Sequence, residues 1–317
     1  MGPTEASNER QILPSRRCPK CGQRLSDAGV GRIVMACKWT KCVRRCARCW
    51  VGYSNGIGDP TIIFGRPTDN VPEEVRDGAL ETLDKALNLL NGGNKKTKFG
   101  FSTSEDALTW TVFRFLHESG QLLDALRAVG LPIPETVIHP RALLLWGVPV
   151  PFDPLAQSEG WKLRERLEAI SNQFGEVPGS RTEPDVVIDL GPHGIVVIEV
   201  KHHHSRTDVK EHAYPGWGGY QPDIEPLRAS GCYELARNWL FGLRLTPNGE
   251  RPFTLACLGP RDLFNGAGDE ILNGFENSLP KDGETGFRRL RWEDLLEAVD
   301  EPPPWFMAYV QSRGYPY

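Results

Sequence analysis

The stretch DVVIDLGPHGIVVIEVKHHH, which spans Asp185–His204, carries the clearest fold signal in this sequence. Two apolar runs flank a Gly-Pro-His-Gly turn, and turn residues between two such runs predict a β-hairpin. Side chains alternate between the faces of a strand, so Glu199 and Lys201 share one face. A three-residue loop would place Asp185 opposite Glu199 on that face, whereas a four-residue loop would not. The sequence leaves this register open.

The charged end of this hairpin indicates a metal site. Two carboxylates that are brought together repel each other unless a cation compensates. Mg²⁺ typically takes one or two carboxylates together with waters and phosphate oxygens, and a nearby lysine can orient a water or stabilise charge on a phosphate. Asp185, Glu199 and Lys201 therefore predict phosphodiester hydrolysis. The alternative interpretation is a charged strand end that runs out into water.

Pro184-Asp185, followed after thirteen residues by Glu199-Val200-Lys201, resembles the motif of the PD-(D/E)XK nuclease superfamily. The resemblance implies a restriction endonuclease-like fold of the α/β (α+β) class, in which helices flank a mixed β-sheet core. It also implies cleavage of DNA with Mg²⁺ or Mn²⁺. Asp185, Glu199 and the Val200 carbonyl would then bind the metal, and Lys201 would position or activate the attacking water.

Many members of this superfamily add an acidic residue from a helix that precedes the hairpin. Glu105 is the candidate for this further metal ligand, with Asp106 as a substitute. The alternative for Glu105 is a capping box that begins at Ser102 and needs no metal.

Three residues near the motif are weaker candidates for phosphate contacts. His202 follows Lys201 directly, and its alternative is a polar exit from the strand. Tyr233 and Arg237 stand four residues apart on a helix predicted over 232–243, where related nucleases often place a Gln or Tyr near the phosphate. Core packing for Tyr233 and a surface ion pair for Arg237 are the alternatives.

The rest of the chain predicts helices and strands that alternate over roughly 70–317, and this order indicates a mixed sheet. Strands are expected at 142–151 and 252–259, and a strand that runs into a helix at 287–299. Further helices are expected at 72–90, from Ser102 onwards, and at 161–174, 232–243, 269–279 and 304–314.

A second site is indicated by cysteine spacing, because six of the eight cysteines lie in the first 50 residues. Without a secretory signal, such a cluster indicates metal ligands before disulfides. Two close pairs, Cys18-x2-Cys21 and Cys37-x4-Cys42, are separated by 15 residues and suit tetrahedral Zn²⁺. The pair Cys46-x2-Cys49 is the alternative to Cys37 and Cys42.

CPKCG, a basic hairpin and C-x4-C resemble the C-terminal zinc ribbons of type I topoisomerases over about 25 residues. The resemblance implies nucleic-acid binding, with Trp39 stacked on a base. Residues 1–60 agree, since eleven Lys or Arg against four acids give +7, while the rest of the chain carries −11 of the total of −4. The predicted phosphate contacts are Arg16, Arg17, Lys20, Arg24, Arg32, Lys38 and Lys41.

These patterns predict a flexible N-terminus over 1–17, a zinc-ribbon DNA-binding module over 18–50, a linker over 51–70 and a nuclease domain over 71–317. The sequence has no apolar run of about 18 residues, so no membrane span is expected. The N-terminus lacks the apolar region of a secretory signal, which favours a cytoplasmic location.

The leading hypothesis is a metal-dependent endodeoxyribonuclease that acts in restriction or anti-phage defence, with DNA repair or recombination as the alternative biology. RNA cleavage and a non-catalytic nucleic-acid-binding protein with a nuclease-like fold are competing functions. Cutting both strands usually requires two active sites, so DNA is the expected partner, together with a second copy of the chain or a partner subunit of a defence system.

Overall fold

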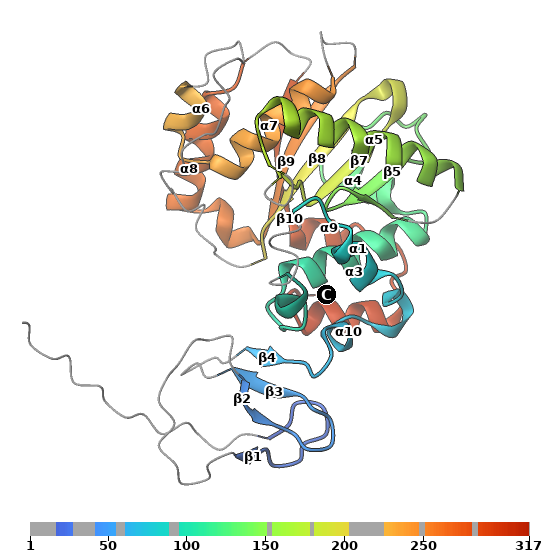
Figure 1. Ribbon diagram of the computed structural model, residues 1–317, viewed down its shortest axis with the longest axis vertical. Coiled ribbons are helices and arrows are strands. Elements are labelled where there is room, and N and C mark those ends of the chain that lie inside the picture. The colour runs from blue at the N-terminus through green and yellow to red at the C-terminus, as the bar shows by residue number, and fades with distance from the viewer. Residues whose placement is uncertain are drawn as a thin grey trace, which may run out of the picture. The chain divides into compact units, whose positions relative to one another are not determined.

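The computed structural model describes residues 17–27, 42–54, 61–88, 95–150, 154–177, 181–202, 225–246, 251–280 and 285–316. The chain divides into two compact units. The first unit comprises Met1–Asn70 with Thr97–Ser104, and the second comprises Val71–Lys96 with Glu105–Tyr317. Figure 1 shows the strands of both units in sequence colours.

The described part of the first unit forms an antiparallel sheet in the order β1-β2-β3-β4. Its strands are β1 (Ser26–Asp27), β2 (Cys42–Arg45), β3 (Gly52–Ser54) and β4 (Ile62–Ile63), and the 3-10 turn η1 (Pro67–Asn70) follows. The expected linker at 51–70 therefore contains two strands. Residues 97–104 return to pair with it, since Phe64 N–H donates to the Gly100 carbonyl at 2.8 Å. Glycine-rich composition could not reveal a partner so distant in the chain.

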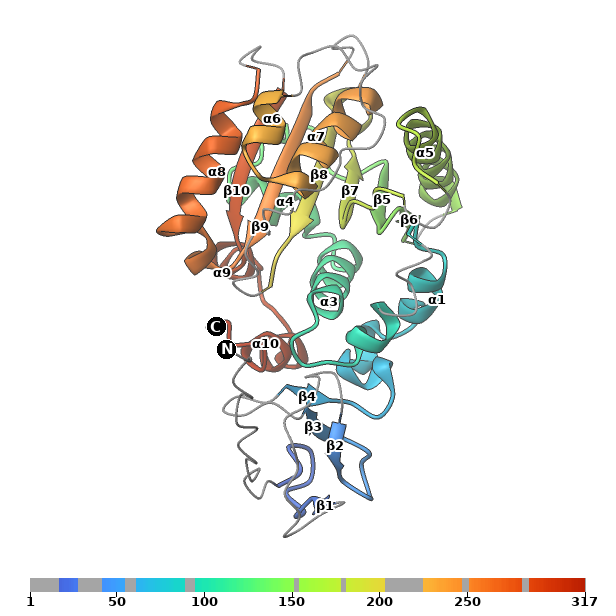
Figure 2. The same cartoon turned by 60° about the vertical axis from the view of Figure 1, so that its left-hand side comes forward.

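The second unit is built on a mixed sheet whose described strands have the order β10-β9-β8-β7-β5-β6. β5, β6, β7 and β8 pair in antiparallel fashion, while β8, β9 and β10 run parallel (Figure 2). The strands are β5 (Ala142–Leu145), β6 (Val148–Pro149), β7 (Val186–Asp189), β8 (Ile195–Val200), β9 (Phe253–Gly259) and β10 (Thr285–Arg291). The expected mixed sheet is confirmed.

Helices cover both faces of this sheet, with α5 and α7 in front and α4 and α9 behind in Figure 1. The helices are α1 (Ala79–Asp84), α3 (Glu105–Glu118), α4 (Leu122–Ala128), α5 (Pro154–Gln173), α6 (Glu225–Ala229), α7 (Tyr233–Leu245), α8 (Ala267–Asn277), α9 (Trp292–Glu297) and α10 (Pro304–Gln311). The 3-10 turns are η2 (Glu73–Val75), η3 (Gly191–His193) and η6 (Arg261–Phe264).

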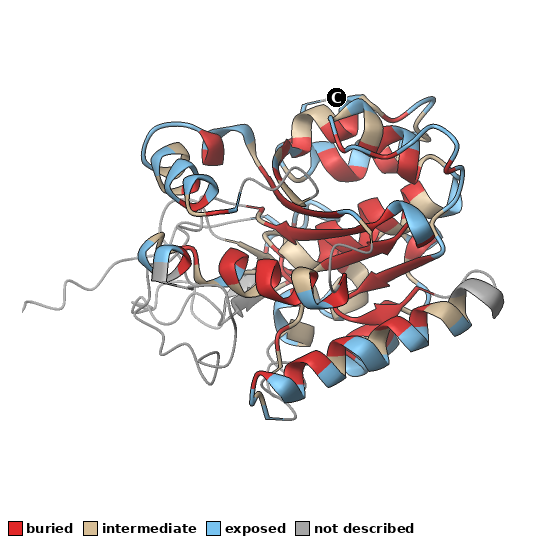
Figure 3. Ribbon diagram, turned by 90° about the horizontal axis from the view of Figure 1, so that it is seen from above, coloured by how far each residue is buried: buried red, intermediate tan, exposed pale blue. Residues whose placement is uncertain are grey.

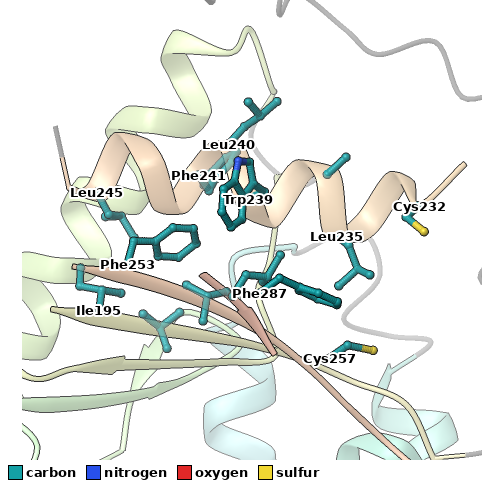
Figure 4. Packing of buried hydrophobic residues seen from close by; sticks show 14 of the residues in the cluster. Ile195, Cys232, Leu235, Trp239, Leu240, Phe241, Leu245, Phe253, Cys257 and Phe287 are labelled. Atoms are coloured by element: carbon teal, nitrogen blue, oxygen red, sulfur yellow. The ribbon is translucent and has the colours of Figure 1, made fainter. Parts of the chain in front are cut away.

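One large cluster of the core lies between the front helices and the sheet. Both faces of the central strands are buried, as the red strands in Figure 3 show, which is typical of a sheet with helices on both sides. Trp239 of α7 packs on Phe253 of β9 with 5.3 Å between ring centres, while Phe241 of α7 packs on Phe174, directly after α5. All of them belong to one cluster with Ile195 and Phe287 (Figure 4). This packing holds α7 along the hairpin.

The hairpin register that the sequence left open is decided by its loop. Val186 pairs with Ile198, and the Leu190 N–H donates to the Gly194 carbonyl at 2.9 Å, so the loop is the three-residue turn η3. Gly194 has φ 118°, and a Cβ there would lie 2.4 Å from the Pro252 carbonyl oxygen, so glycine is required. One further pair of this register sets Asp185 opposite Glu199.

Two predicted elements are broken in the structure. The helix expected at 72–90 is split into η2 and α1, because Gly78 between them has φ 81°. The strand expected at 142–151 is the hairpin of β5 and β6, with both Trp146 and Gly147 at positive φ in the turn. Local sequence periodicity does not distinguish one long strand from two short ones.

Candidate active site and metal centre

The end of the β7–β8 hairpin brings Asp185, Glu199 and Lys201 together. The Asp185 carboxylate accepts a hydrogen bond from the Val200 N–H at 2.8 Å. Lys201 Nζ lies 2.6 Å from Glu199 Oε1, and both side chains are largely buried. The lysine is therefore held by the carboxylate two residues before it on the same strand face.

Helix α7 adds two residues that the sequence analysis missed. Glu234 Oε2 lies 2.8 Å from Lys201 Nζ, and Asn238 donates from Nδ2 to Glu199 Oε2 at 2.7 Å. These residues are four apart, so they lie one above the other on the helix. Tyr233 and Arg237, the pair predicted from sequence, contact each other with the guanidinium 5.2 Å from the ring centre. The residues of this helix that contact Glu199 and Lys201 are thus Glu234 and Asn238, and a phosphate contact by Tyr233 or Arg237 stays a prediction.

Helix α3 brings Glu105 to the same end of the hairpin. Glu105 Oε2 accepts a hydrogen bond from the His202 N–H at 2.9 Å. The capping box that begins at Ser102 is wrong, because α3 begins at Glu105 itself. Asp106, the substitute candidate, has Lys95 Nζ 3.6 Å from its Oδ1, and Lys95 also pairs with Glu183. Glu105 thus binds the backbone at the end of the hairpin, while Asp106 belongs to a neighbouring ion-pair cluster.

The side chain of His202 contacts Tyr315. His202 lies two residues past the end of β8 at Val200. The imidazole is 4% exposed, and its Nδ1 lies 2.9 Å from the Tyr315 hydroxyl oxygen. Nearby, the Trp292 indole N–H donates to the Lys201 carbonyl at 2.9 Å. These contacts give His202 a packing role, and its phosphate contact stays a prediction.

The positive charge near the carboxyl groups of this site does not fully compensate their burial and mutual repulsion. Burial raises the pKa of Glu199 to about 8, with a further contribution from Asp185 that Lys201 opposes. Burial and the neighbouring Glu105 raise the pKa of Asp185 to about 7. Burial, with Asp106 and Glu199, also raises the pKa of Glu105 to about 7 against the effect of Lys201. A hard divalent cation would relieve this crowding.

Lys201 remains a cation in this environment. Burial lowers its pKa, but the carboxylates of Glu199, Glu105 and Glu234 outweigh burial and hold the pKa well above its ordinary value. Its ammonium group is therefore suited to hold a ligand or to stabilise negative charge, because it has no tendency to accept a proton.

The cysteines of the first unit form a closed ligand set. Cys18, Cys21, Cys46 and Cys49 bring their sulfurs within 4.8 Å of one another, and within the described residues this is the one such group of three or more His, Cys, Asp or Glu. Four thiols suit tetrahedral Zn²⁺. The structure thus assembles the alternative set. Cys37 and the side chain of Cys42 lie outside the described residues.

Backbone hydrogen bonds in the second cysteine turn favour the thiolate form of Cys46. The Cys49 and Arg48 backbone N–H groups lower the pKa of Cys46 to about 7, although burial opposes them. The Cys49 N–H lies 3.4 Å from the Cys46 sulfur. A thiolate is the form that binds metal, so this turn is prepared for one.

Three of the predicted phosphate contacts, Arg17, Lys20 and Arg24, are exposed in the first unit. Arg17 also donates from Nη1 to the Gly22 carbonyl at 3.1 Å, which ties its side chain to the first cysteine turn. The other predicted contacts lie outside the described residues, namely Arg16, Arg32, Lys38, Trp39 and Lys41.

Among the helices that the structure describes, none has the length and apolar character needed to cross a membrane. Comparisons with models of protein families, with curated proteins and with solved structures each found no match to this chain.

Proposed function

We propose that this protein is a metal-dependent endonuclease that hydrolyses phosphodiester bonds in DNA. The observation that carries the proposal is the hairpin register, which sets Asp185 opposite Glu199 with Lys201 two residues further along. Crowded carboxyl groups beside a permanent cation are suited to metal-assisted hydrolysis of a phosphate ester.

In this proposal Asp185, Glu199, Glu105 and the Val200 carbonyl would hold Mg²⁺ or Mn²⁺. The donor set fits a hard cation in its chemistry, because it consists of oxygen atoms. When bound, the metal would lower the pKa of a water and offset phosphate charge. The cysteine cluster would hold structural Zn²⁺.

The chain's own residues would position the reacting groups. Lys201 would hold or stabilise the phosphate rather than take up a proton, since its pKa is raised. Glu234 would keep Lys201 in place when Glu199 turns to a metal, and Asn238 would fix the orientation of the Glu199 carboxylate. These two are positioning residues.

The sheet supports the restriction endonuclease-like fold as part of this proposal. Antiparallel β5, β7 and β8 are followed by α7 and then by β9 parallel to β8, which agrees with the mixed core that the superfamily resemblance implies. Restriction or anti-phage defence is the proposed biology on the ground of that resemblance. The basic first unit favours a nucleic-acid substrate.

The test is cleavage by the full, zinc-loaded chain with and without Mg²⁺, on supercoiled plasmid, linear duplex and RNA. Wild type and the control Lys162→Ala, an exposed lysine on α5, should cut DNA when Mg²⁺ is present. Asp185→Asn and Lys201→Ala should each reduce the rate of cleavage roughly 100-fold or more. Equal rates for all four proteins would overturn the assigned site, and cleavage of RNA alone would overturn the DNA substrate.

A further inference from the structure

The two Cys-x2-Cys turns of the first unit are built alike. In each turn, the N–H of the residue after the second cysteine donates to the carbonyl of the first cysteine at 2.8 Å. The residue before each turn is an arginine whose Nη1 caps the same position, Arg17 on the Gly22 carbonyl at 3.1 Å and Arg45 on the Trp50 carbonyl at 2.7 Å. Gly22 and Trp50 therefore occupy equivalent positions.

These equivalent positions carry very different residues in the same backbone conformation. Gly22 has φ 70° and Trp50 has φ 58°. Glycine adopts positive φ without steric cost, whereas a bulky residue there is a genuine outlier. Such strain persists only where the surroundings hold it, and it clusters at functional sites. Tryptophan at this position therefore needs a reason beyond forming the turn.

The surroundings do hold Trp50 in this conformation. Besides the Arg45 bond to its carbonyl, the chain passes close to it at Gly65. A Cβ at Gly65 would lie 2.7 Å from the Trp50 Cβ, so only glycine allows this approach. The result is an indole that points outward, 65% exposed, although tryptophan is a residue that proteins usually bury.

Three basic side chains share a groove with this indole. The groove, of about 710 Å³, is lined by Trp50 together with Lys20, Arg48 and Arg66, and it also borders Cys21 and Cys49 of the thiol set. Asp69 also lines it and pairs with Arg66, with 2.8 Å between Nη2 and Oδ1. An open aromatic face among basic side chains matches a nucleobase and the phosphates on either side of it. The charge of the groove favours this occupant over an apolar peptide.

We infer that this groove, formed by Lys20, Arg48, Trp50 and Arg66, binds single-stranded nucleic acid. An unpaired base stacks on the Trp50 indole, and the adjacent phosphates lie against the three cations. Base pairs within a duplex already stack on their neighbours and offer no free face, so the groove selects unpaired stretches. The inference rests on the proposed function and deepens it, because it names the form of substrate that the first unit takes.

The test measures binding of the full, zinc-loaded chain without added Mg²⁺, so that it does not depend on cleavage. The probes are fluorescently labelled 15-mers of dT and of U, and a DNA duplex of the same length, followed by anisotropy. Trp50→Gly should weaken binding of the single strands roughly tenfold, and Trp50→Phe should keep most of the affinity. Arg48→Ala should lower the slope of log affinity against log salt by about 0.7.

Two controls keep a failure of folding apart from a loss of stacking. Trp50→Gly gives the second turn the residue of the first, so it should keep its zinc. Trp161→Ala removes another exposed indole, on α5, and should bind as wild type does. Unchanged affinity of Trp50→Gly, equal weakening by Trp161→Ala, or binding of the duplex alone would each overturn the inference. A protein that binds single strands through Trp50 but never cuts DNA would overturn the proposed nuclease and leave the groove standing.

Discussion

The cysteine cluster of the first unit and the carboxyl cluster of the second reach their geometry by different routes. Two short turns of the same design bring the four sulfurs within 4.8 Å of one another. The carboxyl groups instead come from α3, β7 and β8, and each is held by a hydrogen bond or an ion pair of the protein itself. The first arrangement is a closed ligand set that local turns can build, and the second is an open one that depends on packing.

Because of this difference, we expect loss of the cysteine cluster to reduce stability and loss of the carboxyl cluster to reduce the proposed activity. A closed thiol set contributes to folding when its metal binds, whereas crowded carboxyl groups oppose folding as long as no cation is bound. The contrast can be tested by substitution, by pH and by added Mg²⁺, and the largest effect is expected at the cysteine cluster.

Cys46→Ser should abolish zinc binding and unfold the first unit, because structural zinc in small modules contributes about 10–16 kcal/mol of apparent binding free energy. The measurements are zinc content per chain and limited proteolysis, which should cut within residues 17–70 and spare the second unit. Cys37→Ser and Cys42→Ser are the matched controls and should each keep one zinc. Loss of zinc in these controls, with zinc retained in Cys46→Ser, would show that the ligand set is the other one.

Asp185→Asn should reduce DNA cleavage roughly 100-fold or more and yet raise the thermal unfolding midpoint at pH 8. The substitution removes a negative charge beside Glu105, while an Asn oxygen can still accept the Val200 N–H. The control is Asp189→Asn at the other end of β7, where the carboxylate pairs with Arg251 Nη1 at 2.8 Å. That variant should lower the midpoint, and a lower midpoint for Asp185→Asn would contradict the prediction.

The unfolding midpoint of the zinc-loaded chain without Mg²⁺ should fall as pH rises from about 6.5 to 8.5. The pKa values of Asp185 and Glu199 are raised to about 7 and 8 from ordinary values of 3.8 and 4.5, so in this window the folded state holds protons that the unfolded state has released. Raising the pH therefore favours unfolding. Burial lowers the pKa of His117 to about 4, so this group acts at lower pH.

Mg²⁺ should reverse this trend, because in the proposed site it would bind the ionised carboxylates of the folded state. Differential scanning calorimetry should show a larger rise in midpoint on adding Mg²⁺ at pH 8 than at pH 6.5. Asp185→Asn should show a smaller rise at both values. A midpoint that responds equally to Mg²⁺ at the two pH values would count against carboxyl groups with raised pKa as the binding site.

The smallest effect is expected from relieving the strained turn. Trp50→Gly should raise the stability of the first unit by about 1 kcal/mol, because it removes a bulky residue from the left-handed region. Gly22→Ala in the equivalent turn should lower the stability by about 1 kcal/mol for the same reason. Resistance of the bound zinc to a competing chelator measures both. A loss of stability in Trp50→Gly would show that the indole contributes to packing.

The amount of this site that the sequence could predict depends on the range of the interactions involved. The hairpin and its charged end follow from alternation with period 2, and helix α7 follows from its apolar repeat with period 3.6. Periodicity alone could not decide which residues of α7 point to the hairpin end. The pair Tyr233 and Arg237 has the same spacing as the pair Glu234 and Asn238. The packing of Trp239 on Phe253 of the sheet turns the second pair toward Glu199 and Lys201.

The sequence by itself determined where the candidate site residues gather, namely at the end of a hairpin that carries Asp185, Glu199 and Lys201 and in a cluster of paired cysteines. Residue type and short-range spacing are local properties, so they can be read from the sequence without knowledge of the fold. Only the tertiary structure decided that Cys46 and Cys49 complete the thiol set, that Asp185 faces Glu199, and that Glu234 and Asn238 join them. Each of these depends on segments distant in the chain, whose meeting is fixed by the burial of apolar faces and by the satisfaction of buried polar groups.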